Sequence, residues 1–399
     1  MNSRAWGHSG DLLCPGDVDS NETLTTLHVP NVLETATPKG LREFTAGAYV
    51  HQVLRNPNSE EVLMNTTTKR TLIAGLTLAL AAVGAATANA ANPARQRSSI
   101  AGTQQASDTA LASDFSALDR NTKWQLTSKL KLNFPTFHTE GIAFAGDRIF
   151  LSAVQIIEPT VKYPTPQGGY DRTPGKGIGH LFVMDHKGNL EKDIVLGEGD
   201  MYHPGGIDSD GKNVWVPVAQ YRPNSSAIIY RVDATTLRVN KQFEVKDHFG
   251  GIVLDKTTGH LVGNTWGSRR FAEWNLNGKQ LNTWVNTNFF IDYQDCQYVP
   301  NSKMICGGVT NLPQTPAAGG TTANYELGGM ALIDLRSHNV LREVPFQQWS
   351  TAGHVATRNP LKLAADGNNL TMWAAPDNGD EGNGTEILTY QATVTPVAK

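Results

Sequence analysis

The sequence of 399 residues has little net charge, few cysteines and no apolar run long enough to cross a membrane. The formal net charge is −3 with no basic block, which argues against nucleic-acid binding, because such proteins need a positive surface to neutralise phosphates. The clearest apolar stretch, residues 72–83, is too short for a membrane-spanning helix. There is also no Gly-x-Ser-x-Gly elbow, Walker phosphate loop or His-Glu-x-x-His pair, so three common enzyme classes lack support.

Cysteine is scarce, with three residues in the chain. Cys14 lies near the N-terminus, and no Cys-x-x-Cys motif is present. Cys296 and Cys306 flank a turn around Asn301, so they would face each other across a hairpin. We expect a Cys296–Cys306 disulfide in an oxidising compartment, with two buried free thiols as the alternative.

Residues 64–90 have the pattern of a secretory signal peptide: a basic start, an apolar stretch and a small-residue cleavage pattern. A signal peptide should begin a protein, so we interpret residues 1–63 as an over-long gene start or a disordered extension. The alternative is a genuine N-terminal extension with an internal apolar hairpin or anchor. The first interpretation predicts an exported protein, periplasmic or secreted, with no membrane span in the mature chain.

Residues 91–122 are rich in Ala, Ser, Gln and Thr and show little periodicity, so we expect a flexible tether there. From residue 123 onward, strand patterns and turn residues dominate, and no convincing long amphipathic helix is evident. The 38 glycines and 20 prolines fit many short strands joined by tight turns, and an apolar content of 39% is adequate for a packed core.

A short motif recurs along residues 123–399, each time followed by a turn, a short strand and a hairpin. Its leading residues are His138, His203, His248, Tyr293 and Asn359. Each repeat reads as four antiparallel strands, the pattern of a β-propeller blade. We therefore expect an all-β fold: a single β-propeller of five four-stranded blades.

Two features decide the number of blades and the closure of the ring. The fifth repeat ends one strand short, and the segment 124–132 is free to supply the missing strand, which would remove exposed sheet edges. Insertions at 158–179 and 311–328 could conceal a degenerate sixth blade, so six blades are the alternative.

The repeat predicts a ring of side chains around one channel mouth, because the innermost strand of each blade runs along the channel. Three of the leading residues are histidines, His138, His203 and His248, which suit Zn²⁺, Mn²⁺ or Ca²⁺ as a divalent metal site. The alternative is that each histidine forms hydrogen bonds to a neighbouring blade and repeats because the blade repeats. We expect Tyr293 and Asn359, the remaining ring members, to contact substrate.

Other candidates lie near the same mouth. Glu140 and Asp295, two residues after a leading position, return to the same strand face and are predicted to be catalytic, as a general base or a cation ligand. The alternative for both is a solvated carboxylate on the rim. Arg222 and Arg269 could bind a carboxylate or phosphate, although loop arginines are usually solvated. Trp266 could stack on a sugar or aromatic ring.

The blade pattern, with Glu140-Gly141 near the start of the first inner strand, resembles gluconolactonases, paraoxonases and strictosidine-synthase-like propellers. The resemblance implies that Glu140 is a metal ligand, joined by asparagines and an aspartate from later blades. The matching positions here are Gly205, Gly250 and Asp295, so the asparagines are missing. In residue type, the histidine-rich channel is more similar to propeller lyases of the oligogalacturonate or virginiamycin type. We expect a separate exported propeller family.

These observations lead to two functional hypotheses. The first is an exported propeller, monomeric, with a His-lined site that acts as a metal-assisted hydrolase or lyase on a small carbohydrate or lactone-like substrate. The second is a non-enzymatic propeller of the cell envelope that uses the same face for a small-molecule ligand or an envelope protein, since a fold alone does not give a function.

Overall fold

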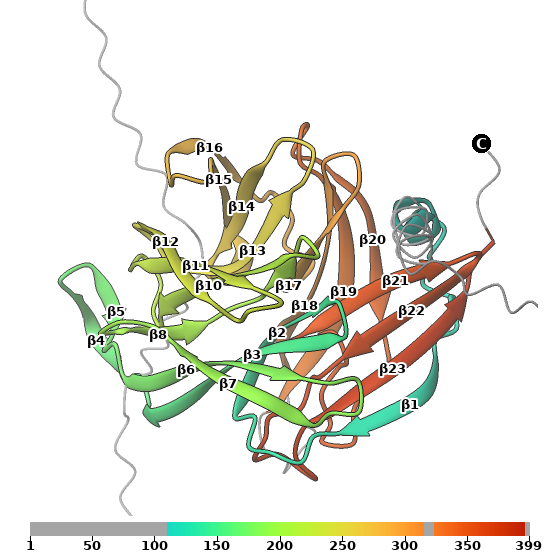
Figure 1. Ribbon diagram of the computed structural model, residues 1–399, viewed down its shortest axis with the longest axis horizontal. Helices are drawn as coiled ribbons and strands as arrows, with labels where there is room; N and C mark the ends of the chain where they lie inside the picture. Colours follow the sequence, from blue (N-terminus) through green and yellow to red (C-terminus); the bar gives the residue numbers. More distant parts are fainter. Residues whose placement is uncertain (1–109, 315–322, 396–399) are drawn as a thin grey trace, which may run out of the picture. The chain divides into compact units, whose positions relative to one another are not determined.

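The computed structural model describes residues 110–314 and 323–395. All of them belong to the compact unit Ala86–Lys399. Residues 1–63 and the predicted signal peptide at 64–90 lie outside the described residues. Five small antiparallel sheets form a ring, which is the arrangement of a five-blade β-propeller (Figure 1).

In each blade the strands pair antiparallel with their sheet neighbours. Blade 1 consists of β2 (His138–Ala145), β3 (Arg148–Glu158), β6 (Lys176–Met184) and β7 (Leu190–Leu196). Blade 2 consists of β8 (Met201–Pro204) with β9 (Asp208–Ser209), β10 (Asn213–Gln220), β11 (Ala227–Asp233) and β12 (Val239–Val245). Blade 3 consists of β13 (Phe249–Asp255), β14 (His260–Thr265), β15 (Arg270–Trp274) and β16 (Gln280–Val285). Blade 4 consists of β17 (Asp292–Val299), β18 (Lys303–Gln314), β19 (Ala323–Asp334) and β20 (Val340–Phe346). Blade 5 consists of β21 (Leu361–Asp366), β22 (Asn369–Ala374), β23 (Glu386–Thr393) and β1 (Gln125–Lys131). The first strand of each blade is the inner one: β17 contacts β2, β13 and β21.

The ring is closed as predicted. Strand β1 pairs antiparallel with β23, so the first strand of the chain is the outer strand of the last blade (Figure 1). The six-blade alternative is wrong, because neither insertion forms a blade. Residues 158–179 contain a two-stranded hairpin, β4 (Lys162–Gln167) and β5 (Tyr170–Arg172), and the described parts of 311–328 extend β18 and β19.

The side chains of β10 alternate between the two faces of its sheet, and each face packs against a different neighbouring blade. Val214, Val216 and Val218 pack into a cluster shared with blade 1. Trp215 and Ala219 pack into a second cluster shared with blade 3. Successive side chains of a strand point to opposite faces, so an unbroken apolar run fits a strand that is covered on both sides.

The inner strand of blade 2 is split into β8 and β9 by Gly205 and Gly206. A Cβ atom on Gly205 would lie 2.1 Å from the Gly250 carbonyl oxygen, and one on Gly206 would lie 2.4 Å from the Gln294 carbonyl oxygen. Only glycine therefore allows the backbones of blades 2, 3 and 4 to approach this closely at the channel.

Residues 110–118, within the segment predicted to be a tether, are ordered against the propeller. Residues 110–116 are helical, and Leu111, Phe115 and Leu118 are buried in the core of blades 4 and 5. The Arg342 guanidinium donates a hydrogen bond to the Leu118 carbonyl at 2.9 Å. The apolar residues Leu111 and Phe115 share one face of this short helix, a signal masked in the sequence by the surrounding Ala and Ser residues.

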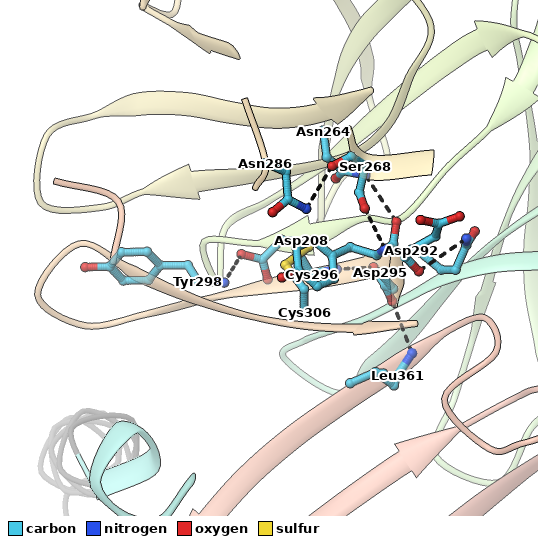
Figure 2. The surroundings of a disulfide bond; sticks show 12 residues. Asp208, Asn264, Ser268, Asn286, Asp292, Asp295, Cys296, Tyr298, Cys306 and Leu361 are labelled. Carbon is cyan, nitrogen blue, oxygen red and sulfur yellow. Dashed lines mark hydrogen bonds between the residues drawn. A yellow bond between two sulfur atoms is a disulfide. The ribbon is translucent and has the colours of Figure 1, made fainter. Parts of the chain in front are cut away.

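Cys296 and Cys306 lie directly opposite each other on β17 and β18 and form a disulfide, as predicted (Figure 2). Disulfides persist in oxidising compartments, which is consistent with an exported protein. Among the helices in the described part of the chain, none is long and apolar enough to cross a membrane.

Candidate functional site

The structure brings the three predicted histidines into a row across blades 1, 2 and 3. His138 begins β2, His203 lies in β8 and His248 immediately precedes β13. The ring centroids of His138 and His203 are 6.3 Å apart, and those of His203 and His248 are 6.1 Å apart. The repeat unit thus places one imidazole from each of blades 1, 2 and 3 next to that of the neighbouring blade.

Glu140 lies between two of these histidines. Its Oε1 atom is 2.8 Å from His138 Nε2 and 3.3 Å from His203 Nε2, and its side chain is buried. The ligand atoms of His138, Glu140 and His203 all lie within 4.8 Å of one another. Two ligand atoms that each lie about 2.0–2.2 Å from one ion are at most about 4.4 Å apart, and the separations of 2.8 and 3.3 Å from Glu140 Oε1 to the two histidines fall within that limit.

Hydrogen bonds determine which ring nitrogen faces the cluster. His138 Nδ1 lies 2.8 Å from Asn378 Oδ1, and the Asn378 amide orientation is fixed because its Nδ2 donates to Glu381. His248 Nδ1 lies 2.7 Å from the Gln220 carbonyl oxygen. Both acceptors require a proton on Nδ1, so the neutral form of each ring keeps its lone pair on Nε2. A metal-binding histidine is held in the same way.

His203 is the exception, because neither of its ring nitrogens has a hydrogen-bond partner among the described residues. Its Nε2 is 3.3 Å from Glu140 Oε1, but without the geometry of a hydrogen bond. The ring is buried and is stacked on Tyr221, with centroids 4.1 Å apart. Buried polar atoms are normally paired, so the two nitrogens of His203 fit a ligand that the protein itself does not supply.

Electrostatics give this cluster the charges of a metal ligand set. Burial lowers the pKa of His203 to about 4 and that of His248 to about 4, so both rings are neutral at pH 7. Burial favours a raised pKa for Glu140, but the imidazoles, His138 first, outweigh it and the pKa is lowered. Burial favours a lowered pKa for His138, but the Glu140 carboxylate outweighs it and the pKa is raised. The carboxylate, the neutral His203 ring and His138, which would release its proton on metal binding, suit Zn²⁺ or Mn²⁺.

Aromatic side chains pack against two of the histidines. The Tyr221 ring lies between His203 and Trp266, whose centroid is 5.7 Å from it. Trp266 also contacts His248 edge-on at 4.8 Å, and the Arg172 guanidinium of β5 lies 4.9 Å from its ring centroid. The predicted position of Trp266 near the histidines agrees with this arrangement, whereas Tyr221 and Arg172 were not among the predicted substrate contacts.

The two predicted arginines are occupied by contacts within the protein. Arg222 donates from Nε to Gln220 Oε1 at 2.8 Å, and its guanidinium lies 3.6 Å from the ring centroid of Tyr170 in β5. Arg269 donates to Asp292 Oδ1 at 2.8 Å. Arg222 therefore holds the β4–β5 hairpin against blade 2, and Arg269 ties blade 3 to blade 4.

The alignment expected from the sequence is shifted by one residue in blade 4. The inner strands of blades 1, 3 and 4 each contain a β-bulge. The bulged residues are Glu140, Gly250 and Gln294, respectively. The equivalent of His138 in blade 4 is consequently Asp292 and not Tyr293. A one-residue shift turns a side chain to the other face of the strand, which explains why Tyr293 is buried against Phe271 in the core.

The same shift moves Asp295 away from the cluster. Its side chain is fully buried, and its carboxylate accepts backbone N–H groups from four blades. The donors are Ile142 at 2.9 Å, Ile207 at 3.0 Å, Cys296 at 3.1 Å and Leu361 at 3.3 Å. Figure 2 shows Asp295 with Cys296 and Leu361. Burial raises the pKa of Asp295 well above its usual value, against the opposing effect of these N–H groups. These contacts favour a structural role for Asp295, and its catalytic role stays a prediction.

Polar contacts also fill the channel near Asp295. Asp208 accepts from Lys362 Nζ at 3.0 Å and from the Tyr298 N–H at 2.8 Å. Asn359, predicted to contact substrate, is buried, and its Nδ2 has no hydrogen-bond partner among the described residues. The contacts of Asp208 connect the inner strands of blades 2, 4 and 5 to one another.

Comparison with solved structures shows distant similarity only. A protein of unknown function from Bacteroides caccae is 11% identical with a TM-score of 0.35, and the match covers 60% of this chain and 72% of that one. A luciferin-regenerating enzyme is 9% identical with a TM-score of 0.39, covering 70% and 98%. A member of the DUF4221 family from Bacteroides vulgatus is 8% identical with a TM-score of 0.36, covering 70% and 100%.

Comparison of sequences is more informative. No curated protein matches the chain. The resemblance to gluconolactonases, paraoxonases and strictosidine-synthase-like propellers therefore stays a prediction. One family model matches residues 101–396, which include the whole described propeller. The chain belongs to the family of unknown function DUF6454.

Proposed function

We propose that this propeller binds a divalent transition metal through His138, Glu140 and His203 and acts as a metal-assisted hydrolase or lyase. The observation that carries the proposal is the buried Glu140 carboxylate between two histidine Nε2 atoms, one of which belongs to a ring with no hydrogen bond of its own. Two neutral imidazoles and one carboxylate form the ligand set of catalytic zinc sites, which keep a further position for water or substrate.

A bound ion would polarise a carbonyl or carboxylate of the substrate. The chain itself would supply binding and proton transfer. His248 lies beside His203 with its Nδ1 proton fixed by the Gln220 carbonyl, so its Nε2 lone pair can accept a proton. Trp266 and Tyr221 offer flat apolar faces for a sugar or lactone ring, and the Arg172 guanidinium borders them. A small carbohydrate or lactone-like substrate fits these groups.

The second candidate is a non-enzymatic binding propeller of the envelope. Two observations favour it. Asp295 is bound by backbone N–H groups of the inner strands, and a backbone carbonyl binds His248 Nδ1, as expected if the leading residues served the blade architecture. The two candidates differ in one respect that can be measured, because only the first requires a metal.

The test is the metal content of the full chain, purified without a polyhistidine tag and measured by elemental mass spectrometry. We expect close to one Zn²⁺ or Mn²⁺ per chain, retained after dialysis, and its loss in a His203→Gln variant. The matched control is His186→Gln, a substitution of an exposed histidine outside the cluster. A protein that contains no metal and takes up no added Zn²⁺, Mn²⁺ or Ca²⁺ would favour the second candidate.

A further inference from the structure

The loop between β22 and β23, residues 375–385, contacts the cluster from blade 5 at two adjacent positions. Asn378 Oδ1 lies 2.8 Å from His138 Nδ1. The Gly379 N–H donates to the Phe137 carbonyl oxygen at 2.6 Å. One short loop thus holds both the side chain of His138 and the backbone of the residue before it.

The backbone at Phe137 is unusual in a way that points to function. Its φ angle is 55°, in the left-handed region that bulky residues rarely adopt. Such strain persists only where the surroundings enforce it, and it is concentrated at functional sites. Here the enforcing contacts are the Gly379 N–H and the His180 ring, which stacks on Phe137 with centroids 5.0 Å apart. A Cβ atom on Gly379 would lie 2.7 Å from Phe137 N, so this approach requires glycine.

Asn378 is itself held rigidly. Its backbone N–H and its Nδ2 donate to the two carboxylate oxygens of Glu381, at 2.8 and 2.9 Å. Glu381 in turn lies 3.3 Å from Arg358 Nη1 and 3.3 Å from His354 Nε2. The amide oxygen of Asn378 is therefore presented to His138 by a fixed chain of contacts and cannot exchange places with the amide nitrogen without breaking it.

From this geometry we infer that Asn378 is the positioning residue of the metal site, an inference that rests on the proposed function. Its Oδ1 keeps the proton of His138 on Nδ1 and thereby keeps the Nε2 lone pair directed at the ion beside Glu140. Outer partners of this kind orient the ring of a ligand and raise its basicity. Glu381 and Gly379 support the same alignment, the first through the Asn378 amide and the second through the Phe137 backbone.

The experiment measures Co²⁺ affinity and the visible Co²⁺ spectrum of the full chain. Removal of an outer partner typically lowers metal affinity by about 10–100-fold, and we expect that loss for Asn378→Leu, with a changed spectrum. The control is Asn383→Leu, an exposed residue of the same loop, which should match the parent protein. If Asn378→Leu does not fold, Asn378→Ala replaces it. Parent-like affinity in either variant would overturn the inference.

A pair of compensating substitutions distinguishes a loss of histidine positioning from a general disruption of the fold. In Asn378→Asp with Glu381→Gln, the acceptor toward His138 is kept, and the new glutamine amide donates to the new aspartate. The net charge is unchanged and every hydrogen bond has a counterpart, so we expect affinity to return to within a few-fold of the parent. Asn378→Asp alone places two carboxylates against each other and should not recover. Failure of the double variant to recover would contradict the inference.

A metal-free measurement distinguishes failure of this inference from failure of the proposed function. Nitrogen-15 NMR of the imidazoles, recorded where the rings are neutral, reports the tautomer of each histidine. We expect His138 with its proton on Nδ1 in the parent protein and a shift toward Nε2 in Asn378→Leu. A parent that binds no metal but shows this change would remove the proposed function and leave Asn378 as the residue that fixes the tautomer of His138. An unchanged tautomer would remove the inference alone.

Discussion

Glu140 and Asp295 are two buried carboxylates on inner strands of the same propeller, and their partners differ in kind. Glu140 lies against the side chains of His138 and His203. Asp295 lies against backbone N–H groups from four blades, among them Ile142. Imidazoles can release a proton or exchange a carboxylate for a metal ion, whereas backbone N–H groups can do neither.

The contrast shows how one repeat supports both a site and a structural centre. Asp295 stands where blades 1, 2 and 3 have glycine, and its carboxylate satisfies the N–H groups that converge on the channel. Glu140 stands at the bulge that precedes that position, where Gly250 stands in blade 3. A carboxylate surrounded by fixed donors stabilises the fold, and a carboxylate surrounded by titratable ligands is available for chemistry.

The largest effect that we expect comes from Asp295→Asn. The substitution preserves shape but replaces one acceptor oxygen by an NH₂ group, which would face backbone N–H donors. Each buried N–H that loses its acceptor costs about 1–3 kcal/mol, so with two donors on each oxygen we expect a loss of about 2–6 kcal/mol in the free energy of unfolding. Urea unfolding followed by fluorescence would measure it.

The control for this prediction is Asp366→Asn, which makes the same chemical change at an exposed position. It should alter stability by no more than about 0.5 kcal/mol. If Asp295→Asn were equally mild, the interpretation of Asp295 as the structural centre of the ring would be wrong.

The next effect concerns pH and the neutral histidines. Their pKa values of about 4 for His203 and about 4 for His248 lie below the unfolded value of about 6.5. Below pH 6.5 the unfolded chain binds protons that the folded chain does not, so stability falls as the pH decreases toward 4. At about 1.4 kcal/mol per pH unit, each histidine lowers the unfolding free energy by about 3 kcal/mol between about pH 6.5 and about pH 4.5, while the raised pKa of His138 opposes this trend.

The measurement is the unfolding free energy of the metal-free protein between pH 7 and pH 4.5, with chelator present. The paired variant His203→Gln, His248→Gln should show a flatter dependence than the parent protein. His186→Gln, which changes an exposed histidine, should follow the parent. Identical slopes in the paired variant and the parent would show that these rings are not held neutral.

The sequence predicts the fold well because the repeat is local and each strand alternates in a readable way. It predicts His138, Glu140 and His203 for the same reason, since the leading motif of each blade carries them. Blade 4 is different: without the glycines of the other blades, its bulge is not visible, and the alignment falls on Tyr293 in place of the preceding aspartate.

Asn378 could not be found in this way, because it lies 240 residues from His138 in the sequence and belongs to no repeat. The one sequence signal for Asn378 is the position of its loop within the blade. Loops after the second strand of a blade lie on the face of the leading residues, and Asn378-Gly379 is a polar turn in such a loop. Which polar side chain of that loop reaches His138 depends on the contacts of Glu381 and on the backbone at Phe137, and both arise only in the folded chain.

The smallest stability effect that we expect comes from Glu140→Gln, and it is the sharpest contrast with Asp295→Asn. Without the carboxylate, His138 loses the charge that raises its pKa, and its burial then favours the neutral ring. The new amide can then donate to the free Nε2 of His138, so a hydrogen bond replaces the ion pair and the unfolding free energy should change by no more than about 1 kcal/mol. Metal affinity should nevertheless fall further than in Asn378→Leu, for which we expect a loss of about 10–100-fold, because Glu140→Gln removes a charged ligand. Urea unfolding and Co²⁺ titration of the same preparation would measure both quantities. A large loss of stability with unchanged Co²⁺ binding would reverse the roles that the structure gives to the two carboxylates.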